Sequence, residues 1–153
     1  MNYESVVSQI ERLLSATKFC TLATVDSTGR PHTAQMCVIS DGIVIYMQTD
    51  SKFEKIKNIG ANQNVAINIG GFNFKCTAEI MGHPEKNELF MHAIAAKHPD
   101  TKKKYTGLAD EVLIKITPIS CRQWRAFDGK EGLLDIDFVN KTLSRTIVDK
   151  IYE

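Results

Sequence analysis

The chain has 153 residues, a formal net charge of +1, 43% hydrophobic residues and 24% charged residues. This length predicts one domain over residues 1–153, large enough to bury a core without metal or disulfide staples. A net charge so near zero gives no support for broad electrostatic binding to nucleic acid or to an anionic membrane.

Four widely spaced cysteines, Cys20, Cys37, Cys76 and Cys121, form no CxxC pair. They therefore offer no zinc ligand spacing, and the first three lie in apolar runs, so we expect free structural thiols and no disulfide. Residues 1–14 carry acidic side chains and lack the apolar core of a signal peptide. No run approaches the roughly 18 apolar residues of a membrane span. Together these features predict a cytoplasmic protein.

The first half of the chain reads as one helix followed by short strands. Residues 3–16 have apolar positions at helical spacing, with Asn2 as a cap. The Asp41-Gly42 dipeptide predicts a hairpin turn, and residues 52–59 predict a helix that stops at Gly60. The expected strands in this half are 18–26, 31–39, 43–48, 65–69 and 72–81.

The second half is predicted to mix helices and strands. A helix is expected to open at His83-Pro84 and to run to about Lys97, and residues 98–110 are expected to form a short helix and a loop. Strands are expected at 112–117 and 121–127, and a C-terminal helix is expected from the spacing of Phe138, Leu143, Ile147 and Ile151. Strands joined by turns, with a helix after the third, favour a mainly β fold: an antiparallel barrel with flanking helices.

The segment from Thr49 to Lys52, at a strand-to-helix junction, is the first candidate for chemistry. Hydroxyl groups and a lysine beside free helix N–H groups can hold a phosphate. The same residue types also make an ordinary helix cap with a surface lysine, and on these residues alone that interpretation is the better one.

Two further residues carry weaker signals. The amide of Gln35 can pair with the edge of a flavin ring, although a polar residue on an exposed strand face explains it better. Trp124, the one tryptophan, is explained by core or interface packing. The histidines show no HExxH or paired spacing, so we expect no metal site, and Ser40 lacks a GxSxG context. No catalytic residue is nominated.

Taken in order, residues 20–69 resemble the pyridoxamine 5'-phosphate oxidase-like family of FMN-binding split barrels. The resemblance rests on the TLAT…GRP hairpin, the Asp-Gly hairpin and the later TxSK…I…N…VxI pattern. It implies an antiparallel split β-barrel and a homodimer with FMN at the subunit interface. It also implies roles for individual residues: Thr33, Gln35, Met36, Cys37 and Val38 along the isoalloxazine and ribityl chain, Thr49, Ser51 and Lys52 at the phosphate, and Trp124 near the flavin.

The sequence departs from the family's pattern at four places. Thr33 stands where the true oxidases carry an arginine, Ser51 directly precedes Lys52 where they carry Ser-Arg-Lys, and Arg125-Ala126-Phe127 replaces their Arg-x-His. The Asn-Pro that is common after the helix is Asn62-Gln63 here. The resemblance therefore implies an FMN-dependent oxidoreductase or flavin reductase acting on a small molecule, and not pyridoxamine phosphate oxidation.

Several alternatives stay open. FAD, a deazaflavin or haem can take the place of FMN, and the barrel can serve as a non-catalytic flavin or haem binder or sensor. A single-stranded nucleic-acid module is disfavoured, because it needs basic grooves with exposed aromatic residues.

Overall fold

The structure is a computed structural model and describes residues 1–148. Within that part, nine strands form one sheet in which every neighbouring pair is antiparallel. The helical elements are α1 (Tyr3–Ala16), α2 (Glu54–Ala61), η1 (Pro84–Lys86), α3 (Glu88–Lys97), α4 (Pro99–Thr101) and η2 (Lys102–Thr106). The strands are β1 (Phe19–Val25), β2 (Pro31–Cys37), β3 (Ile39–Asp41), β4 (Val44–Asp50), β5 (Asn64–Ile69), β6 (Phe72–Ile80), β7 (Glu111–Phe127), β8 (Lys130–Asp137) and β9 (Thr142–Ile147). No helix in this part is long and apolar enough to cross a membrane.

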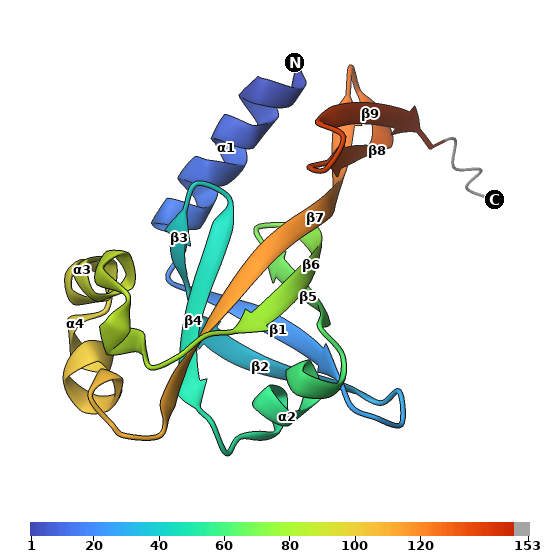
Figure 1. The fold of residues 1–153 in the computed structure, drawn as a ribbon. Coiled ribbons are helices and arrows are strands. Elements are labelled where there is room, and N and C mark those ends of the chain that lie inside the picture. The colour runs from blue at the N-terminus through green and yellow to red at the C-terminus, as the bar shows by residue number, and fades with distance from the viewer. Residues whose placement is uncertain (149–153) are drawn as a thin grey trace.

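The sheet has the order β2-β1-β5-β6-β7-β4-β3, and β8 and β9 continue from β7. It curls until β2 contacts β4, but these two strands do not pair, so the barrel stays open along this line. The first part of β7 pairs with β4, and its last part leaves the barrel and pairs with β8, so that the β8–β9 hairpin projects beyond the other strands (Figure 1). The expected antiparallel split β-barrel with flanking helices is thereby confirmed.

Alternating apolar residues from the strands fill the barrel. Buried positions recur at every second residue of β1, β5 and β6, as a half-buried sheet requires. Helix α1 adds Val6, Ile10 and Leu14 to this core, and a capping box between Asn2 and Ser5 fixes its first turn. The prediction of this helix is confirmed.

The predicted C-terminal helix is wrong. Of its four marker residues, Phe138 follows the end of β8, Leu143 and Ile147 lie on β9, and Ile151 lies outside the described residues. Their spacing suits one face of a helix, yet Leu134, Ile136 and Phe138 also alternate as in a strand. Pairing of β9 with β8, which itself pairs with β7, decides between the two patterns.

Two other predicted boundaries differ from those of the structure. The expected strands 112–117 and 121–127 are one strand, in which Pro118 sits at a bulge: Cys76 opposes Pro118 and Lys75 opposes Ser120. A bulge releases the ladder hydrogen bond that proline cannot donate. The expected helix from Pro84 is split, because η1 ends after three residues and α3 begins anew with Asn87 as its N-cap.

Helix α2 begins two residues later than expected. Its N-cap is Phe53, whose side chain makes no capping hydrogen bond, and Gly60 lies inside the helix rather than at its end. The helix is fixed to the barrel by Asn58, whose buried Nδ2 donates to Thr24 Oγ1 on β1 at 3.1 Å.

Candidate functional site

The outward face of the sheet carries two rows of mostly small polar residues that cross it from β2 to β9. Strand register places the members of each row directly opposite one another, and none of them is buried. One row consists of Gln35, Thr21, Asn68, Asn73, Arg122, Asp135 and Ser144, and the other of Thr33, Ala23, Ala66, Lys75, Ser120, Asp137 and Thr142. We call this surface the outer face. Because it lacks large apolar side chains, it leaves room for a ligand or a second chain close to the strands.

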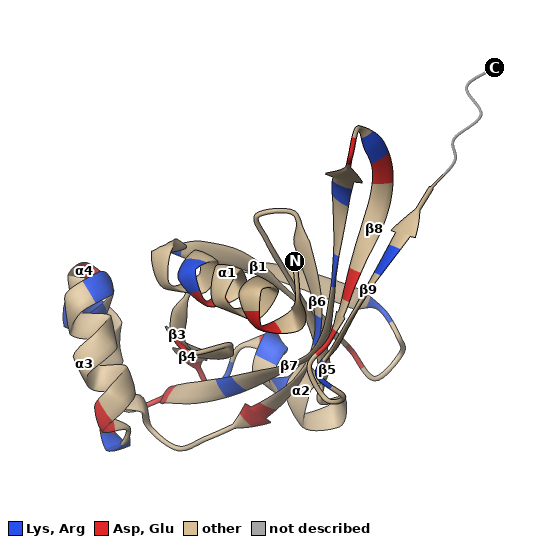
Figure 2. Ribbon diagram, turned by 90° about the horizontal axis from the view of Figure 1, so that it is seen from above, with Lys and Arg blue, Asp and Glu red and all other residues tan. Residues whose placement is uncertain are grey.

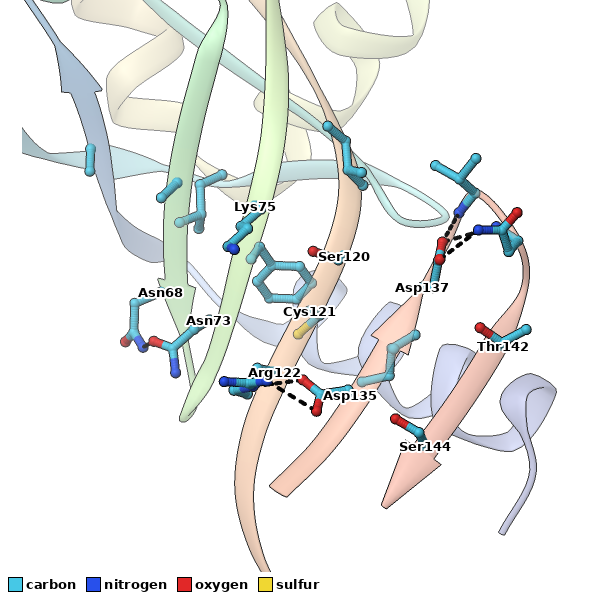
Figure 3. A pocket seen from close by; sticks show the side chains of 18 of the residues that line it. Asn68, Asn73, Lys75, Ser120, Cys121, Arg122, Asp135, Asp137, Thr142 and Ser144 are labelled. Carbon is cyan, nitrogen blue, oxygen red and sulfur yellow. Dashed lines mark hydrogen bonds and ion pairs between the residues drawn. The ribbon is translucent and has the colours of Figure 1, made fainter. Parts of the chain in front are cut away.

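A groove of about 930 Å³ lies on the outer face between β1 and the β8–β9 hairpin. Figure 3 shows labelled side chains of β5 to β9 along it. The Arg122 guanidinium makes a two-pronged contact with Asp135, with Nε–Oδ1 at 2.6 Å and Nη2–Oδ2 at 3.2 Å. The Asp137 carboxylate accepts hydrogen bonds from the turn at Asn140. Lys75 forms no ion pair with a described residue, so its ammonium is available to an anionic group in the groove.

Charges of both signs occur on the elements around the groove. Figure 2 shows basic and acidic positions on the long strands β7 and β8, and also on the α3–α4 pair. This mixture suits a polar ligand with local charge, and it provides no broad basic surface for a nucleic-acid backbone.

A second, smaller cavity, which we call the α2 pocket, has a volume of about 250 Å³ and lies at the N-terminus of α2. Its wall includes Thr33 on β2 and Lys55 in the first turn of α2. The Lys55 ammonium is 3.4 Å from Thr49 Oγ1 and lies over the Phe53 ring, 4.8 Å from its centroid. Burial lowers the pKa of Lys55, and the nearby Glu111 carboxylate opposes that shift. The pocket therefore combines a partly buried cation, a hydroxyl group and a helix N-terminus with the Glu54 carboxylate and the His32 ring.

The residues that the sequence places on β2 separate into two sets. Thr33 and Gln35 are exposed on the outer face, whereas Met36 and Val38 are buried in the core at 7% and 0% exposure. The side chains of Met36 and Val38 thus contact core residues, and only the backbone there remains near the open edge of β2. The half-buried Cys37 Sγ lies 3.8 Å from Thr101 Oγ1.

The expected phosphate residues do not gather in the α2 pocket. Thr49 is buried beside Lys55, Ser51 is exposed in the turn before α2, and Lys52 forms an ion pair with Asp110, Nζ–Oδ2 2.9 Å. The lysine that lines the pocket is Lys55. The prediction from sequence missed Lys55 because it placed the start of the helix two residues too early. The first turn of the helix, as the structure has it, contains Lys55.

Trp124 lies on β7, two residues beyond Arg122 on the same side of the strand, and is 44% exposed. It lines neither the groove nor the α2 pocket. Within one chain, Trp124 therefore shares no cavity with the β2 residues that were expected beside the flavin.

Three of the four cysteines are not candidates for the site chemistry. Cys20, Cys76 and Cys121 are buried and free, and burial raises the pKa of each to about 12. The reactive form of cysteine is the thiolate, so these three residues stay protonated and act as small apolar side chains at neutral pH.

Comparison with known proteins identifies the family. The sequence profile of the pyridoxamine 5'-phosphate oxidase family matches residues 6–125. General stress protein 26 of Bacillus subtilis is 34% identical over 70 residues, which are 46% of this chain and 49% of that protein, so the match spans about half the length of this curated relative.

Two solved structures share the fold. General stress protein 26 of Bacillus anthracis superposes with a TM-score of 0.62 at 23% identity, covering 76% of this chain and 91% of the other. HutZ, the haem storage protein of Vibrio cholerae, superposes with a TM-score of 0.59 at 18% identity, covering 77% of this chain and 91% of the other. With more than half of its length matched by the family profile, this chain belongs to the pyridoxamine 5'-phosphate oxidase family.

Proposed function

We propose that the chain binds FMN and acts as a flavin-dependent oxidoreductase or flavin reductase on a small molecule. The observation that carries this proposal is the α2 pocket, where Lys55 and Thr33 border a helix N-terminus without a side-chain cap. Free N–H groups and the positive end of the helix dipole favour a phosphate there. Membership of the family supports a cofactor of this class.

The outer face provides the surface for the remainder of the cofactor. Thr33 and Gln35 are exposed beside the unpaired edge of β2, where backbone N–H and C=O groups are available to a ring. When bound, FMN supplies hydride or electron transfer, and the protein supplies position and electrostatics. The neighbouring groove has room for a substrate, and the Lys75 ammonium favours one that carries an anionic group.

The test is a comparison of two lysines that lie three residues apart. If Lys55 holds the phosphate, Lys55→Ala removes a charge-assisted contact of about 1.5–3 kcal/mol, which weakens FMN binding roughly ten- to a hundredfold. Lys52→Ala is the matched control, since Lys52 is directed at Asp110, and it should leave FMN affinity unchanged. Riboflavin, which lacks the phosphate, should bind all three proteins equally well. Equal affinity of wild type and Lys55→Ala for FMN would contradict the proposed phosphate site.

A second candidate function is non-catalytic binding of a flavin or haem. It is favoured by the shared fold with HutZ, which is a haem storage protein. An absorption spectrum of the purified protein distinguishes flavin from haem, and NAD(P)H-dependent bleaching of a bound flavin distinguishes the enzyme from the passive binder.

A further inference from the structure

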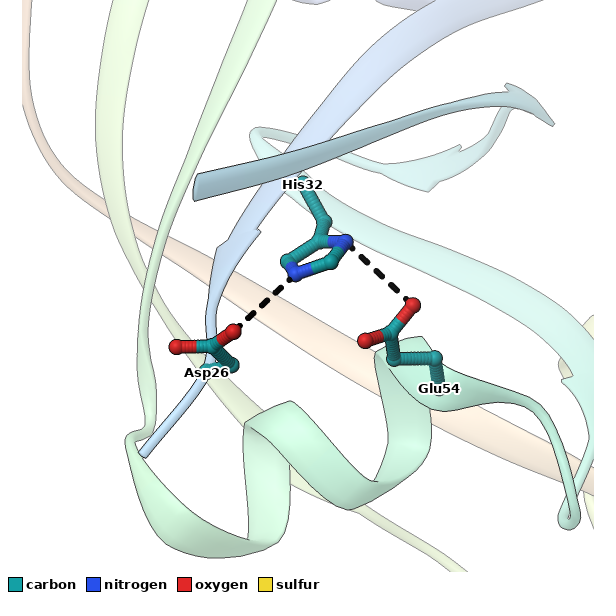
Figure 4. Close-up of side chains that lie close together, drawn as sticks. All are labelled: Asp26, His32 and Glu54. Atoms are coloured by element: carbon teal, nitrogen blue, oxygen red, sulfur yellow. Dashed lines mark hydrogen bonds and ion pairs between the residues drawn. The ribbon is translucent and has the colours of Figure 1, made fainter. Parts of the chain in front are cut away.

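Three side chains from separate segments gather at the rim of the α2 pocket. Asp26 follows β1, His32 lies on β2 and Glu54 begins α2 (Figure 4). His32 Nε2 is 3.3 Å from Asp26 Oδ2, and His32 Nδ1 is 3.3 Å from Glu54 Oε2. The ring is thus placed between two carboxylates, and one ligand-type atom from each residue lies within 4.8 Å of the others.

The turn that follows β1 fixes the position of the Asp26 carboxylate. Its Oδ1 accepts hydrogen bonds from Thr28 Oγ1 and from the backbone N–H groups of Thr28 and Arg30. A carboxylate accepts hydrogen bonds, so Asp26 Oδ2 pairs with Nε2–H of the His32 ring.

The other ring nitrogen then faces a second acceptor. With the proton on Nε2, the lone pair of Nδ1 is directed at the Glu54 carboxylate, and two acceptors at 3.3 Å repel each other unless a proton or a cation lies between them. His83, which also has a carboxylate neighbour, differs: its Nε2 lies 2.8 Å from Leu108 O, and its Nδ1 accepts from Glu85 N. Only the His32 ring has a carboxylate facing each nitrogen among the described residues.

The geometry points to a divalent metal site of the zinc class at this position: we propose that His32 Nδ1 and Glu54 bind the ion and that Asp26 orients the ring through Nε2–H. Zinc bonds of about 2.0–2.2 Å to nitrogen and oxygen give a tetrahedral edge of about 3.3–3.5 Å, and the Nδ1–Oε2 distance matches it. A carboxylate on the far ring nitrogen is the usual support of a metal-binding histidine. Waters complete the coordination on the side of the α2 pocket.

The experiment titrates zinc chloride into tag-free, flavin-free protein by calorimetry. Wild type should bind one ion per chain, and His32→Ala and Glu54→Gln should bind it at least about tenfold more weakly. Asp26→Asn, which removes the orienting carboxylate, should lose roughly ten- to a hundredfold in affinity. His92→Ala, an exposed histidine on α3, and Cys37→Ser, a half-buried thiol, are controls that should bind as wild type does.

Zinc should also raise the melting temperature of wild type and leave that of Glu54→Gln unchanged, which separates loss of the site from loss of the fold. Equal zinc affinity in wild type, His32→Ala and Glu54→Gln, or no binding by wild type at millimolar zinc, would overturn the proposal. The proposal does not rest on the flavin function, because the probe is the metal alone.

Discussion

His98 is a buried residue whose charge state the fold restricts. Its ring is 6% exposed, lies against Phe19 with centroids 5.6 Å apart, and leaves Nε2 without a hydrogen-bond partner in the described residues. Burial lowers the pKa of His98, and Lys97 and Lys18 lower it further, against a hydrogen bond from the ring to the Val38 backbone carbonyl, which raises it. The folded protein therefore resists protonation of this ring.

This shift predicts acid sensitivity with a definite sign. As the pH falls through about 6.5, the unfolded chain takes up a proton at His98 before the folded chain does, so the free energy of unfolding falls. Urea unfolding between pH 7.5 and 5.5 should show a steeper loss in wild type than in His98→Gln. The other histidines are common to both proteins, so equal pH slopes would contradict the assignment.

A single buried hydrogen bond is expected to anchor α2 to the barrel. Asn58 is 2% exposed and donates to Thr24, which is 1% exposed. Asn58→Ala leaves the Thr24 hydroxyl without this partner, and we expect it to lower the free energy of unfolding by about 1–3 kcal/mol. Lys57→Ala, an exposed change on the same helix, should stay within about 0.5 kcal/mol of wild type by denaturant unfolding. Similar losses in both variants would argue against a specific anchor.

At the level of elements, alanine substitutions at two glycines should change the stability of the protein in opposite directions. A Cβ at Gly60 meets nothing within 4 Å, so Gly60→Ala should stabilise α2 by about 0.5–1 kcal/mol. A Cβ at Gly132 on β8 would lie only 2.5 Å from Thr146 O and 2.9 Å from the Phe127 ring, so Gly132→Ala forces the β8–β9 hairpin apart. We expect a loss of about 1–3 kcal/mol.

Thermal unfolding checks both signs, and amide exchange locates the second effect. Residues 130–147 should exchange faster in Gly132→Ala, while α2 keeps its protection. A Gly132→Ala protein as stable as wild type would show that the hairpin tolerates a wider spacing.

At the level of the whole molecule, we predict a homodimer that forms through the outer face. This face crosses the sheet without a large apolar side chain in either row, so the strands of a second copy related by a two-fold axis can approach it closely. Lys75, which forms no ion pair with a described residue, is available to an acidic group of that copy. Trp124, which lines neither the groove nor the α2 pocket of its own chain, is exposed and can contribute to such an interface.

Light scattering should give twice the chain mass of 17.1 kDa for wild type. Ala66→Arg, in the middle of the outer face, should give the monomer, while Lys103→Glu on η2 should leave the dimer intact. A wild-type protein that is monomeric with its cofactor bound would contradict this prediction.

The fold was largely predictable because local patterns and tertiary packing agree over the first 81 residues. Alternating apolar residues, the Asp41-Gly42 turn and the Asn2 cap each specify their element without long-range information. The prediction failed where local patterns are ambiguous: residues 138–147 suit a helix or a strand, and the pairing of β9 with β8 decides for the strand.

The candidate site was predictable only in part. The strand and turn pattern predicted the mainly β class, and the resemblance of residues 20–69 implied the split barrel and the family. The same resemblance named Thr33 and Gln35, which the structure places on the exposed face. Tertiary structure alone decided that Lys55 rather than Lys52 lines the α2 pocket, because one turn of helix changes which side chain faces inward. It alone brought Asp26, His32 and Glu54 together, since their contact depends on how a hairpin and a helix pack and not on their spacing in the chain.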